Sequence, residues 1–207
     1  DVAEEFQPLP VAGKTDLTAS PDGRWFAVAQ EGRERRRHVH VYNLVSGEFV
    51  TQLTAKESGF ISSLNFSPDA RWLVRLEAMA ADYQLTVFDV RDWHPRYSKR
   101  YPRNGDEANW SSFDPAGRLV ATAGAALNTL RIWELSTGRL LAHANGRADS
   151  PYFAWSRDGR TLALHYGGQT HFWSMVVFRE LISFPSDAVP LGFTEHELPF
   201  PAWVMSV

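Results

Sequence analysis

The chain contains no cysteine, and this absence excludes both a disulfide framework and a thiolate metal site. No apolar run approaches the ~20 residues that a membrane-spanning helix needs. The formal net charge of −3 over 207 residues leaves no basic excess of the kind that nucleic-acid-binding or membrane-surface proteins carry. We therefore expect no membrane association and rank nucleic acid low among partners. The chain starts at Asp1 without a signal-like segment, which suggests a mature form or an excised piece.

Familiar catalytic and cofactor motifs are lacking as well. There is no Gly-x-Ser-x-Gly elbow and no glycine-rich phosphate loop, because the pair Gly167-Gly168 is better interpreted as a tight turn. His38 and His40 lie two residues apart and would share one face of a strand, but no third metal ligand accompanies them. We expect no catalytic residue, no cofactor and no metal, and thus a protein that is not an enzyme.

What the chain does have is an ordinary hydrophobic content of 44%, a heavy aromatic load and an internal repeat. A turn followed by arginine and a short apolar run occurs four times: SPDGRWFAVA from Ser20, SPDARWLVRL from Ser67, DPAGRLVATA from Asp114 and WSRDGRTLAL from Trp155. The arginines at 24, 71, 118 and 160 are separated by 47, 47 and 42 residues. A repeat of this length is the signature of stacked units that cannot bury their apolar faces alone.

A second signal keeps step with the first, namely an aromatic residue at Tyr42, Phe88, Trp133 and Trp173. The runs after each turn are nearly all apolar, as in a strand buried on both faces, whereas the last run of each unit is more polar. Pro-Asp-Gly supplies the chemistry of a tight reversal between antiparallel strands. Each unit therefore predicts a four-stranded antiparallel sheet with buried inner strands and a wetter outer one. Helical periodicity is nowhere sustained, so the fold class is all-β.

These residues resemble the WD40-repeat β-propeller family, most closely over 113–142, where IWEL stands at the family's Trp-Asp position. The units are degenerate, because the family's Gly-His pair is absent and its hydrogen-bonded tetrad of His, Ser/Thr, Asp and Trp cannot be assembled in full. We expect blades held mainly by aromatic packing, with less polar cross-bracing than the family's complete tetrad would give. The segment AWSRDGRTLAL is also similar to propellers of exported periplasmic proteins and prolyl peptidases.

The resemblance implies one propeller domain or segment over 1–207, with repeats at about 13–54, 59–102, 108–145 and 150–185. Residues 188–207 would begin a fifth blade, and residues 1–12 would form the outer strand of a preceding or closing blade. An open arc of a larger propeller is favoured over a closed small ring. The residues expected to hold the repeat are Asp22, Gly23, Tyr42, Asp69, Phe88, Asp89, Gly117, Trp133, Glu134, Asp158, Gly159 and Trp173.

A candidate partner-binding feature is the longest inner loop, EGRERRRHVH, which carries Arg33, Arg35, Arg36 and Arg37. In a propeller this loop would share a rim with the polar loop that holds Asp106 and Glu107. Arginines so clustered could bind an acidic or phosphorylated segment by bidentate hydrogen bonds. Alternatively they pair with Glu31 and Glu34 and merely keep the loop soluble.

Two functions from different classes follow. The first is a non-catalytic protein–protein interaction scaffold, which presents a rim of loops to a protein or peptide partner or to adjacent domains of a larger chain. The alternative is a regulatory or substrate-gating propeller of a multidomain kinase or peptidase whose catalytic domain lies outside this chain. A small ligand in the central channel stays open but has no residue to recommend it. The Ala- and Arg-rich repeats suggest a bacterial protein. We expect it in the cytoplasm, with the periplasm or export as the alternative, and open blade edges would permit self-association.

Overall fold

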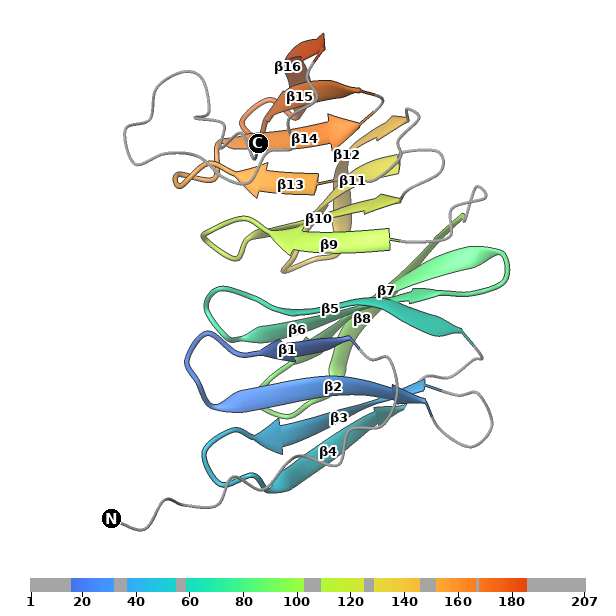
Figure 1. Cartoon of the computed structure of the whole chain (residues 1–207), viewed down its shortest axis with the longest axis vertical. Coiled ribbons are helices and arrows are strands. Elements are labelled where there is room, and N and C mark those ends of the chain that lie inside the picture. Colours follow the sequence, from blue (N-terminus) through green and yellow to red (C-terminus); the bar gives the residue numbers. More distant parts are fainter. Residues whose placement is uncertain are drawn as a thin grey trace, which may run out of the picture.

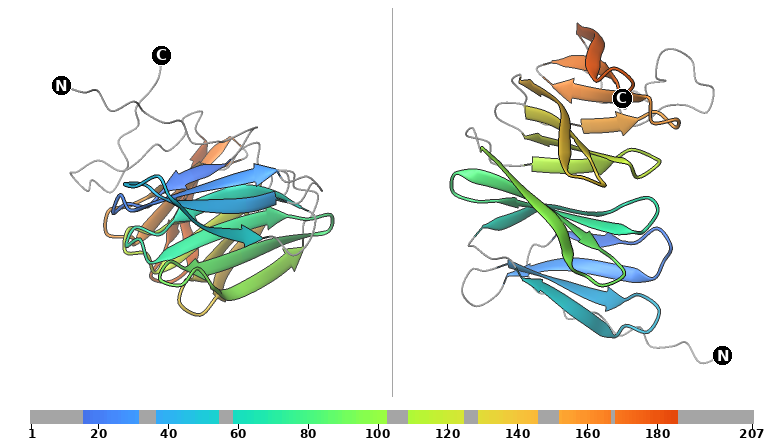
Figure 2. Two further views of the ribbon diagram at one scale, coloured as in Figure 1. Left: turned by 90° about the horizontal axis from the view of Figure 1, so that it is seen from below. Right: turned by 180° about the vertical axis from the view of Figure 1, so that it is seen from behind.

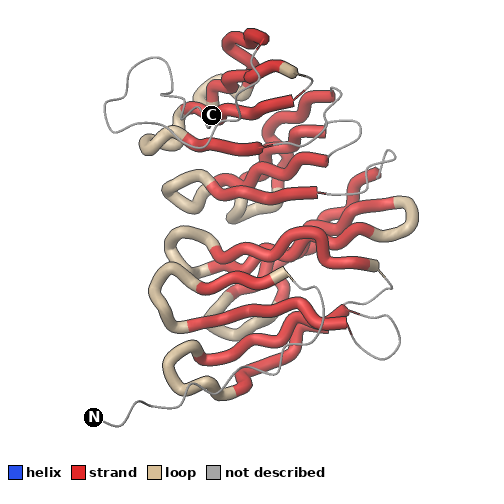
Figure 3. Tube along the Cα trace, in the orientation of Figure 1, coloured by secondary structure: helices blue, strands red, loops and turns tan. Residues whose placement is uncertain are grey.

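The computed structural model describes residues 16–31, 37–54, 59–102, 109–124, 129–145, 152–166 and 168–185, and within these ranges every regular element is a strand (Figure 3). The strands form four antiparallel sheets of four strands each, and in every sheet the strand order follows the chain. The first sheet contains β1 (Leu17–Ala19), β2 (Trp25–Glu31), β3 (Arg37–Asn43) and β4 (Phe49–Thr54). The second contains β5 (Phe60–Phe66), β6 (Trp72–Ala78), β7 (Asp82–Asp89) and β8 (Pro95–Pro102). The third contains β9 (Asn109–Phe113), β10 (Leu119–Gly124), β11 (Thr129–Glu134) and β12 (Arg139–Asn145). The fourth contains β13 (Tyr152–Trp155), β14 (Thr161–Tyr166), β15 (Gln169–Ser174) and β16 (Arg179–Pro185).

The sheets follow one another as four blades, from the first at one end to the fourth at the other (Figures 1 and 2). The leading strands β1, β5 and β9 contact each other in turn, so the first strands of the first three blades lie side by side. The first and fourth blades lie at opposite ends of the assembly, and the ring is not closed (Figure 1). The predicted all-β architecture of four-stranded antiparallel blades in an open arc is confirmed, whereas the exact division into repeats stays a prediction.

The recurring turn between the first two strands is fixed by its own side chains. In the first blade the Ser20 hydroxyl donates to Asp22 Oδ1 over 2.5 Å, and the Trp25 amide donates to Ser20 Oγ over 2.9 Å. Gly23 takes a φ of 71°, which costs a residue without a Cβ very little. The second and fourth blades repeat the serine–aspartate bond, with Ser67 and Ser156 as donors. The turn therefore reverses the chain in the same way in three of the four blades.

The third blade reaches the same reversal with different chemistry. Asp114 replaces the serine, is fully buried, and its Oδ1 accepts hydrogen bonds of 2.6 Å from the amides of Arg118 and Leu119. One carboxylate thus does the work that a hydroxyl and a carboxylate share in the other three turns. This explains why the fragment FDPAGR can differ from FSPDAR in the second blade without changing the turn.

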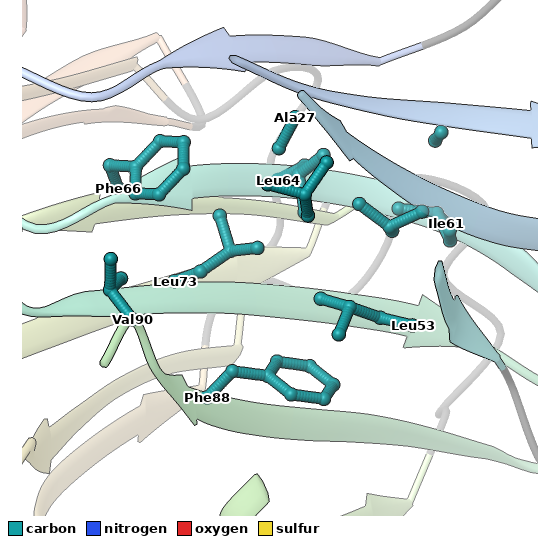
Figure 4. Close-up of a cluster of buried hydrophobic side chains, with 11 residues drawn as sticks. Ala27, Leu53, Ile61, Leu64, Phe66, Leu73, Phe88 and Val90 are labelled. Atoms are coloured by element: carbon teal, nitrogen blue, oxygen red, sulfur yellow. The ribbon is translucent and has the colours of Figure 1, made fainter. Parts of the chain in front are cut away.

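The hydrophobic core lies between successive blades rather than within one sheet. Between the first two blades, Ala27 and Leu53 face Leu64, Leu73 and Phe88 (Figure 4). All five are at most 5% exposed, and burying a side chain the size of leucine or phenylalanine stabilises a fold by about 1.5–3 kcal/mol. Comparable clusters lie between the second and third blades and between the third and fourth. Each blade therefore shields the apolar face of its neighbour.

The blade interfaces carry hydrogen bonds as well as apolar contacts. Arg75 Nη1 of the second blade donates to the Leu53 carbonyl of the first over 3.0 Å. Tyr97 Oη of the second blade donates to the Leu135 carbonyl of the third over 2.7 Å, and burial raises the pKa of this phenol well above its usual value. Trp155 Nε1 of the fourth blade donates to Ser112 Oγ of the third over 3.1 Å. Each blade junction thus has at least one hydrogen bond that fixes its register.

Candidate functional site

The predicted partner-binding loop is only partly covered by the structure. Arg33, Arg35, Arg36, Asp106 and Glu107 lie outside the described residues. Arg37 is the first residue of β3 and pairs through its backbone with Glu31 at the end of β2. Because the strands are antiparallel, the ends of β2 and β4 and the starts of β3 and β5 lie at one edge of the arc, here called the loop rim (Figure 1). The opposite edge, where the Pro-Asp-Gly turns lie, is here called the turn rim.

The predicted repeat positions occupy equivalent places in the blades. Asp22, Asp69 and Asp158 each accept the backbone N–H of the arginine two residues later. Gly117 and Gly159 share the positive φ of Gly23, at 63° and 69°. In each of these turns a carboxylate stabilises the reversal. In the fourth blade, the hydrogen bonds from Ser156 and from the Arg160 backbone lower the pKa of Asp158. These residues shape the turn rim rather than forming a site for chemistry.

The four predicted aromatic positions are all buried, but each has a different polar environment. Trp133 Nε1 donates to Thr122 Oγ1 over 3.1 Å, which supplies two of the four members of the hydrogen-bonded tetrad expected from the resemblance. Trp173 has no such partner, because its buried Nε1 lacks a hydrogen bond within the described residues. Tyr42 instead packs edge-on against His40 and Phe49. Phe88 contacts the Arg75 guanidinium instead of a hydroxyl such as that of Thr122.

The acids that follow two of the aromatics also differ. Asp89 is 2% exposed and is held by the guanidinium groups of Arg91 and Arg96. The hydrogen bonds from Arg91 and Arg96 keep the pKa of the Asp89 carboxyl well below its usual range. Glu134 lies nearer the surface, where hydrogen bonds from Thr137 and Arg139 lower its pKa. Both acids brace the hairpin between the third and fourth strands of their blade.

The two histidines that the sequence places on one strand face are linked through an amide. His40 Nε2 lies 3.0 Å from Gln52 Oε1, and Gln52 Nε2 lies 3.1 Å from His38 Nδ1. Across the described ranges, no group of three or more histidine, aspartate or glutamate side chains is placed to hold a metal ion. The part of the chain that the structure describes contains no helix long and apolar enough to span a membrane.

A polar patch that the sequence reasoning missed lies on the face of the second blade that packs against the first. Arg75 pairs across the strands with Thr86, which pairs with Ser98, and Gln84 pairs in the same way with Arg100. Thr86 Oγ1 lies 3.0 Å from Ser98 Oγ, and Arg100 Nε donates to Gln84 Oε1 over 3.1 Å. Two rows of polar side chains therefore run outward from the core between the two blades.

A buried ion pair anchors this patch. Arg75 Nη2 lies 2.9 Å from Glu77 Oε2, and the two side chains are only 3% and 5% exposed. The Arg75 guanidinium also lies over the ring of Phe88, 5.1 Å from its centroid, and its buried Nε has no hydrogen-bond partner within the described residues. Burial lowers the pKa of Arg75, whereas Glu77 opposes that shift. A signal was available in the run WLVRLEA, because opposite charges two residues apart lie on the same face of a strand.

This patch lines a groove of about 390 Å³ that opens between the first and second blades. Its apolar part is formed by Leu53, Phe88 and Trp93, and its polar part includes Ser98, Arg75 and Arg100. A second, larger groove of about 570 Å³ lies at the turn rim of the second, third and fourth blades, and its lining includes Arg71, Arg118 and Arg139 together with Asp69 and Glu134. The larger groove is lined by charges of both signs. Among the described residues that line the smaller groove, the charged ones are Arg75 and Arg100.

Comparison with known proteins agrees with this architecture. No family model matches the chain. An uncharacterized WD repeat-containing protein of Synechocystis sp. is 28% identical over 127 residues, which cover 61% of this chain and 33% of that protein. Actin-interacting protein 1 of Drosophila melanogaster is 20% identical over 138 residues, or 65% of this chain and 22% of that protein. The matched part thus spans a third or less of each of these relatives.

Among solved structures, hydrazine synthase of Kuenenia stuttgartiensis superposes with a TM-score of 0.64 at 15% identity, covering 85% of this chain and 63% of that chain. At this level of identity the likeness shows the fold alone. The stacked antiparallel blades define the chain as a β-propeller arc. Its repeats are similar to those of the WD repeat-containing relative, and the hydrogen bond between Trp133 and Thr122 agrees with that similarity. The predicted bacterial origin agrees with the cyanobacterial relative, while the other relative comes from an insect.

Proposed function

We propose that this chain acts as a non-catalytic scaffold that presents its loop rim to a protein partner or to a neighbouring domain. The observation that carries the proposal is the repetition of rigid blades, which brings the connections after β2 and β4, and their equivalents, to one edge of the arc. Loops displayed from a rigid scaffold are well suited to binding. The relatives support this reading, since both are WD-repeat or interaction proteins by name, and one is called an actin-interacting protein.

Within this proposal, the arginines of residues 33–37 make the principal contact with an acidic segment of the partner. The test is affinity capture with the wild type and with an Arg35→Glu/Arg36→Glu variant, followed by identification of the captured proteins. A charge-matched control is Arg24→Glu/Arg160→Glu, because both arginines are exposed on the turn rim. We expect the loop variant to lose its partners and the control to keep them. Identical partner lists for all three proteins would contradict the role of the loop.

A regulatory propeller of a multidomain enzyme is the second candidate. It is supported by the lengths of the curated relatives, of which the matched repeats cover 33% and 22%, so that such repeats occur within longer chains. The gene that encodes this chain decides between the two candidates. A kinase or peptidase domain in the same reading frame would favour the regulatory role, and a reading frame made of repeats alone would favour the scaffold.

A further inference from the structure

We propose that two copies of this chain associate through the turn rim, where a hairpin tip of each copy enters the 570 Å³ groove of the other. The tip consists of Val176 and Val177, which lie between β15 and β16 of the fourth blade. This surface is separate from the loop rim, so the proposal does not depend on the partner proposed there.

The tip is rigid, and its two side chains face solvent. Val176 and Val177 are 64% and 55% exposed. The residues on either side of them, Met175 and Phe178, pack into the core between the third and fourth blades. The backbone amides of both valines donate to Ser174 Oγ, over 3.2 and 3.4 Å. Two apolar side chains are therefore presented by a turn that is already held in one shape, which lowers the entropic cost of binding.

The turn itself gives no reason for two valines, because tight turns favour Gly, Pro, Asn, Asp and Ser. The third and fourth residues after the repeat aromatic occupy the same place in the other blades: Val45 and Ser46, Arg91 and Asp92, and Ser136 and Thr137. Among the four blades that the structure describes, only the fourth has two apolar residues at this tip. Leu181 and Ile182 of β16 are exposed as well, so the apolar surface continues along the outer strand. Contiguous exposed apolar surface is typical of association sites.

The groove beside the tip has an apolar lining that suits it. Its apolar residues come from three blades, namely Trp72, Leu119, Leu141, Met175 and Phe178. Its volume falls within the ~300–1,000 Å³ of sites that enclose side chains or ligands. The side chains of Arg118 and Arg139 also line the groove but are largely exposed, so their charged groups can stay in water when an apolar tip enters.

The position of the tip next to the groove points to a second copy as the occupant. Met175 and Phe178 line the groove and also flank the two valines in the chain. A projection and a hollow of matching polarity therefore belong to one surface patch. A two-fold axis brings a patch against itself, so that each projection meets the hollow of the other copy. One surface thus supplies both halves of the contact.

Sedimentation velocity across a dilution series of the full chain tests the proposal. Wild type should show a monomer–dimer equilibrium. Val176→Asp should weaken the association by at least about thirtyfold, which is the effect of removing an interface hot spot. The turn should tolerate the new charge, because the second blade has Arg91 at the same place. Circular dichroism of each variant checks that the fold is kept.

The matched control is Val45→Asp. It makes the same replacement at the same place in the hairpin of the first blade, where the valine is 86% exposed and does not line the groove. Exposed replacements of this kind change free energies little, so the dimer of this variant should dissociate within about twofold of wild type.

A variant of the groove tests the other half of the contact. Ser136 is exposed and lines the groove, so Ser136→Phe should fill it without disturbing the core and weaken the dimer as much as Val176→Asp. The two variants damage opposite halves. In a mixture, the intact tip of the Ser136→Phe chain can enter the intact groove of the Val176→Asp chain. The mixture should therefore contain more dimer than either variant alone.

Three results would each overturn the proposal: a wild type that stays monomeric throughout the series, equal weakening by Val176→Asp and Val45→Asp, or a mixture that associates no better than its components. The proposed function is tested separately. Val176→Asp should capture the same partners as wild type, and Arg35→Glu/Arg36→Glu should still form the dimer. Unchanged partners in the loop variant would count against the loop and leave the dimer standing.

Discussion

Removing Glu77 should destabilise the protein far more than an exposed carboxylate would, because it leaves the buried Arg75 cation without its counter-charge. Arg75 is 3% exposed, and its remaining contacts are one backbone carbonyl and the face of Phe88. Breaking a buried pair by removing one partner costs about 3–5 kcal/mol. The total stability of a domain is about 5–15 kcal/mol. Glu77→Leu should therefore consume a large fraction of the stability of the arc.

Replacing both partners at once should restore most of that loss. In Arg75→Met/Glu77→Leu no charge is left buried, so we expect the variant to lie within about 1 kcal/mol of wild type or above it. Guanidinium denaturation followed by tryptophan fluorescence and by far-ultraviolet circular dichroism measures the free energies of unfolding, provided that the two transitions coincide. The control is Glu134→Gln, whose side chain is 33% exposed and pairs with an arginine at 3.6 Å. It should cost less than about 1 kcal/mol.

The reasoning would be refuted if Glu77→Leu cost no more than Glu134→Gln. It would also be refuted if the double variant were as unstable as the single one. The second result would mean that the groove residues stabilise the blade interface through packing that the apolar pair cannot replace, rather than through compensation of charge.

Three further predictions concern the turn at Ala70, the hydrogen bond between Trp133 and Thr122, and the buried Asp89 carboxylate. Ala70 takes a φ of 56° where the other three turns have glycine, so Ala70→Gly should stabilise the fold by about 0.5–1 kcal/mol in the same denaturation assay, and a loss would contradict the strain. Thr122→Val and Trp133→Phe should each destabilise the third blade, with a coupling energy of about 1 kcal/mol in a double-mutant cycle; additive effects would show that their hydrogen bond contributes nothing. Because Arg91 and Arg96 depress the folded-state pKa of Asp89, its stabilising contribution should be complete above the unfolded value of about 4 and disappear as the pH falls toward the lower folded value. The difference in free energy of unfolding between wild type and Asp89→Asn should accordingly shrink as the pH falls from about 5 to about 2.5. A difference that stays constant over this range would exclude the linkage.

The repeat was predictable because its signals are local. A serine and an aspartate two residues apart hold the turn whatever lies around it, as at Ser67 and Asp69. The buried aromatic in each third strand follows from alternation along the strand, and Trp133 is 5% exposed as that pattern requires. The openness of the arc was favoured because the count of units was small and neither end matched a complete blade.

The details that escaped prediction depend on contacts between blades. Trp93 holds a φ of 58° in a turn where two other blades place Gly47 and Gly138, and such a conformation is costly for a bulky residue. The structure accounts for it through packing, because Trp93 lies edge-on to Trp25 of the preceding blade at 5.5 Å and to Phe66 at 6.4 Å. Nothing near position 93 in the sequence indicates that neighbour, which is 68 residues away by subtraction.

The groove between the first two blades combines a missed signal with one that was not available. Arg75 stands in a run that is otherwise apolar, and Glu77 follows it by two residues, a spacing that places both charges on one face of the strand. The groove itself, with Gln52 and Thr54 of the first blade and Ser98 and Arg100 of the second in its lining, depends on how the two blades pack and has no local signal in the sequence.

Distances between equivalent turns test the central claim most directly, that four blades follow one another around an axis without closing. The absence of cysteine allows spin labels to be placed freely, and Ser46, Asp92, Thr137 and Val177 occupy equivalent exposed positions between the third and fourth strands of successive blades. Pulsed electron paramagnetic resonance on three double-cysteine variants, each pairing position 46 with one of the others, gives the three distances. An open arc predicts that the distance from 46 increases in the order 92, 137, 177, whereas a 46–177 distance as short as 46–92 would show a closed ring and contradict it.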